Sequence, residues 1–283
     1  MARIGIIGGS GLYQMDGIQN LNEIEVETPF GRPSDALMAG VLNGRELVFL
    51  ARHGRGHRYL PTEVPYRANI WAMKAAGVDR IFAISAVGSM KEEIHPGHMV
   101  VPRQFIDLTR HRKSTFFGDG CVAHVSYGHP VDEGMARHLV VAARELGLTV
   151  HDGGTYVCME GPQFSSRAES MLYRSWGVDV IGMTNATEAK LAREAELGYA
   201  TLALSTDYDC WKDEEVTADA VVAVLLQNAR NAQSVIRKVL ERMKPDEPCA
   251  AHGALKTAIV TGRDAIPPET RRRLEPLIGK YLG

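Results

Sequence analysis

The sequence has few of the motifs that mark disulfide-bonded, metal-binding or dinucleotide-binding proteins. Its four cysteines (Cys121, Cys158, Cys210 and Cys249) form no CxxC pair, so we expect neither a disulfide framework nor a structural zinc site. Its ten histidines include no HExxH motif, and we expect no metal ion. The chain also lacks GxGxxG spacing and a Walker lysine, which argues against a site for a dinucleotide or a nucleoside triphosphate.

Long runs of one residue type are also missing. The net charge is −2, and the charged residues form no block of one sign. We therefore expect no nucleic-acid partner and no disordered tail. The first residues lack the apolar length of a signal peptide, and no window approaches a membrane span. The expected location is the cytoplasm, with no membrane partner.

The residues that are present predict an α/β fold. Of the 283 residues, 45% are hydrophobic, as in a globular domain, and short apolar runs alternate with stretches of helical periodicity. We expect strands at residues 4–7, 47–51, 80–85, 100–101, 155–159, 178–181 and 199–204, and helices at 132–146, 166–176, 186–197, 217–243 and 268–282. Two prolines end the long helix near residue 245. We therefore expect a main domain over 1–244 and a C-terminal extension over 245–283, packed on that domain or on a partner subunit.

Asp207 and Asp209 follow directly after the apolar run 199–204. The carboxyl ends of strands in an open α/β sheet are where ligands bind. An ionised carboxylate accepts hydrogen bonds from N–H groups, and a protonated one donates to a ring nitrogen. The pair therefore suits a flat heterocycle, although a solvated acidic turn after a strand would have the same sequence.

Four other predicted strand ends carry hydrogen-bond donors. They present Ser10 in a glycine turn, Arg52 with His53, Ser85 in a turn of small residues, and Thr184 after Gly182 and Met183. Each segment alone is an ordinary turn or solvated loop. If one sheet gathers them on one side, they form a small site with about one positive charge, which fits a single inorganic phosphate.

These segments strongly resemble the S-methyl-5'-thioadenosine phosphorylases, in the trimeric branch of the purine nucleoside phosphorylases. The resemblance runs through residues 3–240 and includes the motifs GGSGL (8–12), TPFGRPSD (28–35), ARHG (51–54), ANIWA (68–72), EGPQFSSRAE (160–169) and TDYDCW (206–211). It implies one α/β domain with a central mixed sheet flanked by helices. It also implies a homotrimer or dimer of trimers, and reversible phosphorolysis of a purine nucleoside without a cofactor, inorganic phosphate being the co-substrate.

The resemblance also implies roles for single residues. Ser10, Arg52, His53, Ser85, Ala86 and Thr184 would hold phosphate. Met183 would contact the ribose, Phe164 would line the base pocket, and His124 would reach the 5' region of a neighbouring subunit's site. Two positions depart from the family pattern: Gly182 stands where asparagine is common, and Thr187 where proline is usual.

Asp207 is the expected catalytic acid. A pKa raised by burial and by the carboxylate of Asp209 would let it donate a proton to N7 of the departing purine. In the related 6-oxopurine enzymes an asparagine replaces Asp207 and a glutamate replaces Ser165, so we expect a 6-aminopurine here. A 6-oxopurine or methylthioinosine phosphorylase on the same fold is the main alternative. A hydrolytic nucleosidase and a non-catalytic binding protein are further alternatives.

Overall fold

The apolar runs assemble into one mixed sheet of 11 strands built around β5 (Val78–Ser89). The computed structural model describes residues 3–9, 11–212, 218–244 and 246–282. One path of the sheet contains β2 (Gln19–Ile24), β3 (Leu37–Leu42), β4 (Arg45–Ala51), β1 (Arg3–Gly8), β5, β10 (Val180–Gly182), β9 (Thr155–Cys158) and β7 (Gln104–Asp107). A branch contains β11 (Gly198–Asp207), β6 (Met99–Val101) and β8 (Val150–Asp152).

The sheet divides along β5. On one edge, β1 pairs in parallel with residues 78–83 and β10 pairs antiparallel with Gly88 and Ser89. On the other edge, β11 runs parallel to β5 from Arg80 to Gly88. Among the described strands, none pairs with residues 84–87 on the first edge. Ligands in α/β sheets bind where neighbouring strands diverge, so this interval is the natural position for a site.

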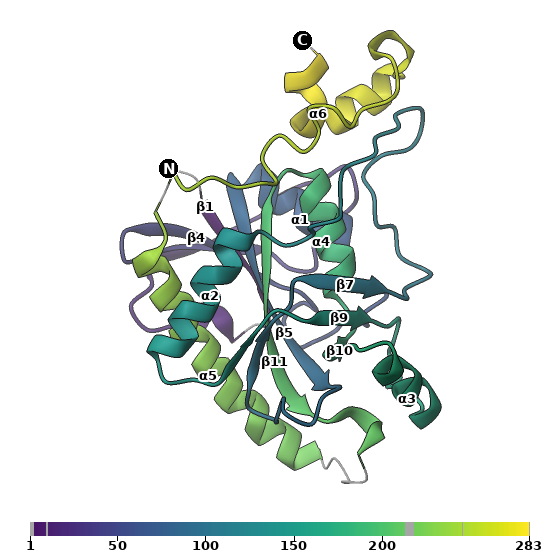
Figure 1. The fold of residues 1–283 in the computed structure, drawn as a ribbon. Coiled ribbons are helices and arrows are strands. Elements are labelled where there is room, and N and C mark those ends of the chain that lie inside the picture. Colours follow the sequence, from purple (N-terminus) through teal and green to yellow (C-terminus); the bar gives the residue numbers. More distant parts are fainter. Residues whose placement is uncertain (1–2, 10, 213–217, 245, 283) are drawn as a thin grey trace.

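Helices cover both faces of the sheet (Figure 1). Residues on one face pack with α2 (Glu133–Glu145) and α5 (Ala218–Arg242), and those on the other with α1 (Tyr66–Ala75) and α4 (Asn185–Glu194). Because strand side chains alternate between faces, Ile6 lies in the first of these cores and Ile7 in the second. The fold is therefore the expected single α/β domain with a central mixed sheet.

The C-terminal segment packs against the second of these cores. Leu255 and four residues of α6 (Pro268–Leu282), namely Leu274, Leu277, Ile278 and Leu282, are buried there with Ile70 of α1. In Figure 1, α6 lies beyond the end of the sheet, beside the long connection between β7 and α2. That connection meets the C-terminal segment at an isolated bridge between Ala123 and Ile259.

Most predicted elements occur within one or two residues of their expected limits. The helix expected at 166–176 is α3 (Arg167–Ser175), and Ser166 caps it in a box with Glu169. The start of the long helix, residue 217, lies outside the described residues. The sequence pattern predicts neither α1 nor the strands β2, β3, β7 and β8. Seven of the ten residues of α1 are buried, so this helix lacks the alternation of an amphipathic one. No helix in the described part of the chain is long and apolar enough to cross a membrane.

Candidate active site

Arg52 occupies the unpaired interval beside β5. It follows β4, and its Nη1 donates to the carbonyl of Ile84 at 2.8 Å while Nη2 lies 3.4 Å from the carbonyl of Ile7. The guanidinium also pairs with Glu188 of α4: Nε lies 2.5 Å from Oε1, and Nη2 lies 3.0 Å from Oε2. Both side chains are buried, with 4% and 1% exposed. Arg52 therefore ties the ends of β1 and β4 and the middle of β5 to the first half of α4.

The ion pair changes the expected charge of the site. The sequence predicted about one positive charge, but the carboxylate of Glu188 neutralises the guanidinium of Arg52. The hydroxyl of Tyr199 donates to Oε2 of Glu188 at 2.9 Å, and Nδ2 of Asn185 donates to that hydroxyl at 2.8 Å. The carboxylate of Glu188 thus accepts hydrogen bonds at both of its oxygens. The prediction of a net positive site was wrong, because it lacked the acidic partner from α4.

Ser85 and Thr184 come together through the antiparallel pairing of β10. Val180 pairs with Ser89 and Ile181 with Gly88. Just beyond this pairing, Ser85 and the backbone of Thr184 both hydrogen-bond with the hydroxyl of Tyr156. Both residues are buried. Ala86, which follows Ser85 in β5, is exposed. The expected strand ends therefore meet, but β10 runs in the direction opposite to β5.

Met183 lies next to this pair and is held by a second arginine. Its carbonyl accepts a hydrogen bond from Nη1 of Arg112. Arg112 also binds Glu160, with Nε 3.0 Å from Oε1 and Nη2 2.7 Å from the carbonyl. The side chain of Met183 lies against Gly161, where a Cβ would come within 2.5 Å of the sulfur. Arg112 and Gly161 thus fix both the backbone and the side chain of Met183.

His53 lies in the turn after Arg52 and is partly buried. Its Nδ1 is 2.8 Å from the carbonyl of Tyr59, and its ring stacks on His57 with centroids 4.3 Å apart. Burial lowers the pKa of His53 to about 4, and the charge of Arg52 acts in the same direction. The imidazole is therefore neutral at neutral pH, with Nδ1–H as the donor to Tyr59.

The two acidic residues lie at the end of β11, opposite Gly88. The register between β11 and β5 shifts between Ser205 and Asp207, so Thr206 forms a β-bulge of the kind that redirects a side chain. The hydroxyl of Thr206 donates to Oδ2 of Asp207 at 2.7 Å, and the N–H of Asp209 donates to Oδ1 at 2.8 Å. The bulge and these bonds fix the orientation of Asp207.

Asp209 is the more buried member of the pair. Burial raises its pKa, and the carboxylate of Asp207 raises it further. Asp209 adopts the left-handed backbone conformation, with φ of 52°, which turns the chain back toward β5. A Cβ at Gly88 would lie 3.1 Å from Oδ1 of Asp207 and 3.3 Å from Cβ of Asp209. Glycine at position 88 therefore makes room for both acids.

The acids and the Ser85 hydroxyl lie along the same strand, β5. Asp207 lies opposite Gly88, and Ala203 lies opposite Ser85. Gly88 and Ser85 are three residues apart, or roughly 10 Å along a strand. Residues 85–88 therefore form a short stretch of β5 with the hydroxyl of Ser85 at one end and the two acids beside its other end. The structure brings together Arg52, Ser85, Met183, Thr184, Asp207 and Asp209 around this part of β5.

Other expected site residues lie at its margin or elsewhere. Ser165 is next to the acids, because its carbonyl accepts from the thiol of Cys210 at 3.1 Å. Phe164 is 80% exposed. His124 is also exposed, on the connection between β7 and α2, where its N–H donates to the carbonyl of Ala258 at 2.9 Å. Ser10 lies outside the described residues.

Sequence reasoning missed three residues that position the site. Glu188 and Arg112 carry no motif of their own, and only their buried ion pairs show their importance. Thr206 could have been found, since the TD pair directly follows an apolar strand. Of the two departures from the family pattern, Thr187 lies buried in the first turn of α4, and Gly182 contacts Tyr156, as described below.

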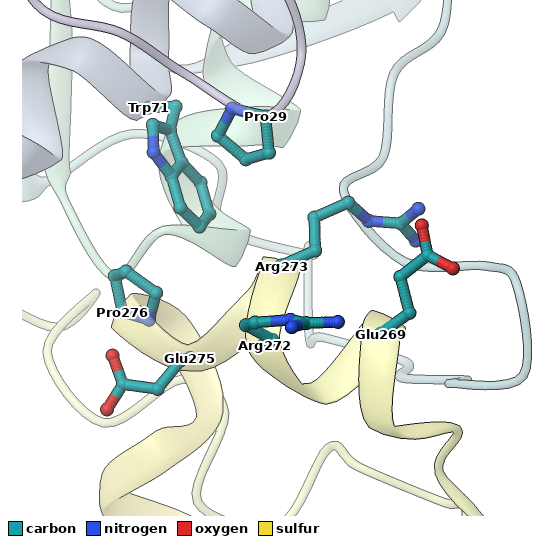
Figure 2. Close-up of a pocket in the computed structure, with 7 residues that line it drawn as sticks. All are labelled: Pro29, Trp71, Glu269, Arg272, Arg273, Glu275 and Pro276. Atoms are coloured by element: carbon teal, nitrogen blue, oxygen red, sulfur yellow. The ribbon is translucent and has the colours of Figure 1, made fainter.

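A separate cavity of about 790 Å³ lies between α6 and the region of Pro29 and Trp71. Figure 2 shows Pro29 and Trp71 on one side of it and Arg272 and Arg273 of α6 on the other. It contains none of the expected site residues. Within the described residues, no group of three or more His, Cys, Asp and Glu side chains could hold a metal ion.

Comparisons with known proteins identify the family. The Phosphorylase superfamily model matches residues 3–241. An S-methyl-5'-thioadenosine phosphorylase of Geobacter sulfurreducens is 57% identical over 282 residues, covering 99% of each protein. The enzyme of that name from Koribacter versatilis is 57% identical over 284 residues, covering 100% of this chain and 97% of the relative.

Solved structures agree with the sequence comparison. A methylthioadenosine phosphorylase from an Antarctic soil metagenomic library has a TM-score of 0.95 and 51% identity, covering 98% of each chain. The methylthioadenosine phosphorylase of Schistosoma mansoni in complex with adenine has a TM-score of 0.79 and 36% identity, covering 86% of this chain and 92% of the other. This chain belongs to the phosphorylase superfamily and, within it, to the S-methyl-5'-thioadenosine phosphorylases.

Proposed function

We propose that the protein catalyses phosphorolysis of S-methyl-5'-thioadenosine, producing adenine and 5-methylthioribose 1-phosphate. The observation that carries this proposal is the arrangement along β5: Asp207 lies opposite Gly88, and Ser85, three residues earlier on the same strand, shares the Tyr156 hydroxyl with the backbone of Thr184. The names of the relatives and of the similar structures give the same activity.

The phosphate subsite consists of Ser10, Arg52, His53, Ser85, Ala86 and Thr184. Bonds to Glu188, Ile84 and Ile7 occupy four of the five N–H donors of Arg52, leaving one at Nη1 for a phosphate oxygen. Because Glu188 neutralises Arg52, hydroxyls and backbone N–H groups provide most of the binding. Phosphate is a co-substrate, and the reaction needs no cofactor.

The reaction exchanges one bond at C1' of the sugar for another. A phosphate oxygen attacks C1' from the face opposite the base and forms the new C–O bond. The C1'–N9 bond breaks, and its electron pair passes to the purine. The acid pair then supplies a proton to N7, so adenine leaves as a neutral molecule. The bound phosphate anion stabilises the positive charge on the ribose ring across a short distance.

The substrate's other groups have separate partners. Met183 contacts the ribose, and Phe164 and Ser165 line the base pocket. We assign delivery of the proton to N7 to Asp207, with Asp209 beside it. The oxygens of Asp207 already act as acceptors for Thr206 and Asp209. A carboxylate acceptor suits the 6-amino group of adenine, which is a donor.

The active form is a homo-oligomer, a trimer or a dimer of trimers, located in the cytoplasm. In it, His124 of one subunit reaches the 5' region of a neighbouring subunit's site. The exposure of His124 and the anchoring of its backbone to Ala258 support this role. Light scattering would give the mass, and a monomeric active enzyme would contradict this assembly.

A substrate panel tests the activity directly. Methylthioadenosine, methylthioinosine, adenosine and inosine are each incubated with and without phosphate, and the sugar product is identified. We expect rapid turnover of methylthioadenosine only with phosphate, and a sugar 1-phosphate as product. Release of free 5-methylthioribose without phosphate would identify a hydrolase instead, and a preference for inosine-type substrates would contradict the adenine assignment.

A further inference from the structure

We propose that Tyr156 is a positioning residue of the phosphate subsite, and that residue 182 is glycine because the Tyr156 hydroxyl fills the space of its side chain. The inference rests on the proposed function, because it assigns Ser85 and Thr184 to phosphate. It adds a residue on β9 to a site that otherwise comes from β4, β5, α4 and β11.

The space at Gly182 carries the steric part of the argument. A Cβ at position 182 would lie 1.9 Å from the hydroxyl oxygen of Tyr156 and 2.6 Å from Cζ. Gly182 is not among the glycines with positive φ, so its backbone conformation does not require glycine. The requirement is one of space, and the Tyr156 hydroxyl creates it.

Strand pairing explains how the tyrosine reaches this position. Tyr156 lies opposite Val180 in the parallel pair of β9 and β10. Val180 and Gly182 are two residues apart and share a face of the sheet. The long side chain of Tyr156 therefore extends along β10 to Gly182, at the point where the chain turns into Met183 and Thr184.

The surroundings of the hydroxyl carry the chemical part. Tyr156 is fully buried, and its oxygen lies 3.4 Å from Oγ of Ser85. Hydrogen bonding by Ser85 and by the backbone of Thr184 acts on the pKa of Tyr156 in the direction opposite to burial. A buried hydroxyl without partners is costly, so a phenylalanine would suit a purely apolar role. The partners of the Tyr156 hydroxyl are Ser85 and Thr184, which are both assigned to the phosphate subsite.

In this chain the polar group beside position 182 comes from β9 instead of β10. Asparagine at position 182 would supply a polar side chain from β10, whereas in this chain the hydroxyl from β9 occupies the same place. We infer that the hydroxyl orients Ser85 and the first N–H groups of α4 toward phosphate. It acts through these groups and has no part in the bond exchange at C1'.

The first test removes only the hydroxyl. In Tyr156→Phe the ring packing against Phe105, 5.6 Å between centroids, is kept. We expect KM for phosphate to rise about tenfold, with kcat and KM for methylthioadenosine changing less than threefold. The matched control is Tyr127→Phe, which removes a buried hydroxyl that has no hydrogen-bond partner in the described structure. That control should leave all three constants unchanged.

The second test uses the pairing of positions 156 and 182. Gly182→Asn alone should lower Tm strongly, because its side chain meets the tyrosine. Combined with Tyr156→Leu, which removes the obstructing atoms, it should regain most of the lost Tm, so that the two effects are not additive. Additive losses of Tm would overturn the steric half of the proposal.

Calorimetric titration with inorganic phosphate gives a readout independent of turnover. Equal phosphate Kd values for the wild type and Tyr156→Phe, with equal KM values, would overturn the positioning role. The wild-type protein is assayed in parallel: if it shows no phosphorolysis at all, the proposed function fails, whereas the calorimetric comparison still decides the role of Tyr156.

Discussion

Arg52 and Glu188 form the ion pair at the centre of the proposed phosphate subsite. Both side chains are nearly inaccessible, and the coulombic attraction of Glu188 keeps Arg52 charged, with its pKa raised despite the opposing effect of burial. Two opposite charges in such a place stabilise each other, and removing one leaves the other unpaired in a poorly solvated interior.

We expect Glu188→Ala to lower the free energy of unfolding by about 3–5 kcal/mol, the usual cost of an unpaired buried charge. Urea denaturation measures this loss, and added phosphate should restore stability more in the variant than in the wild type. Glu46→Ala is the control, since it breaks an exposed pair with Arg3 and should cost less than about 1 kcal/mol. Equal losses in the two variants would contradict the prediction.

Asp207 determines the choice of base in the proposed mechanism. Asp207→Asn removes the proton source and replaces one acceptor with an amide donor. We expect kcat/KM for methylthioadenosine to fall on the order of a hundredfold or more, and activity on inosine-type substrates to improve relative to it. Steady-state assays with both substrates measure the change. An unaltered preference for the amino compound would show that Asp207 does not contact the base.

His53 makes stability depend on pH. Its pKa is lowered from 6.5 to about 4 in the folded protein, so between these values the unfolded chain binds the proton more readily. Stability attributable to His53 is therefore present above pH 6.5 and is lost as the pH falls toward 4. We expect His53→Gln to lose less stability than the wild type between pH 7 and pH 4.5, in urea titrations. His129→Gln, at an exposed position, is the control and should keep the wild-type pH dependence. If His53→Gln loses as much stability as the wild type over this pH range, the explanation is refuted.

At the scale of secondary-structure elements, α3 supports the acid pair from outside the sheet. It contacts the short 3-10 helix η2 (Asp209–Trp211), which carries Asp209. The N-terminus of α3 is stabilised by the Ser166 side chain, which accepts from the N–H of Glu169, and by the reciprocal bond in which the N–H of Ser166 donates to the Glu169 carboxylate. In the proposed mechanism, the start of α3 therefore bears on both stability and base binding.

Ser166→Ala should lower the free energy of unfolding by about 1 kcal/mol, the usual value of an N-cap. Because the helix start then frays, KM for the nucleoside should rise while KM for phosphate stays constant. Ser175→Ala, at the exposed end of the same helix, is the control and should change neither. A rise of both KM values in Ser166→Ala would indicate a general loss of structure instead.

At the scale of the whole molecule, the C-terminal extension shares a core with the main domain. Leu277 of α6 is 2% exposed and belongs to the same cluster as Ile70 and Tyr199. The carboxylate of Glu196 adds polar contacts, accepting from the N–H of Leu255 at 2.9 Å and from the hydroxyl of Tyr281 at 2.6 Å. Residues 246–282 should therefore unfold together with the sheet.

Leu277→Ala tests this cooperativity. We expect a loss of about 2–5 kcal/mol, as for other buried leucines, in one transition that includes the whole chain. Calorimetry and denaturant titration followed by two probes measure it. Leu172→Ala on α3, where the side chain is 50% exposed, should have little effect. A separate early transition in Leu277→Ala would show that the extension folds independently.

Most elements, and the hydroxyls, arginine and acids of the site, could be predicted from the sequence. Periodicity located most strands and helices, because each reflects the alternation of buried and exposed positions within one segment. The donor groups at strand ends and the acids after β11 could be recognised for the same local reason. The family motifs then connected those segments to phosphate and purine chemistry.

Tertiary structure decided the contacts between segments far apart in sequence. Glu188 meets Arg52 across 136 residues, and Tyr156 fills the space at Gly182 only because β9 and β10 pair in parallel. The antiparallel direction of β10, and the burial of α6 on the main core, likewise follow from which surfaces pack together. No short segment specifies such pairing, because its free energy depends on the apolar area and polar partners that the rest of the chain provides.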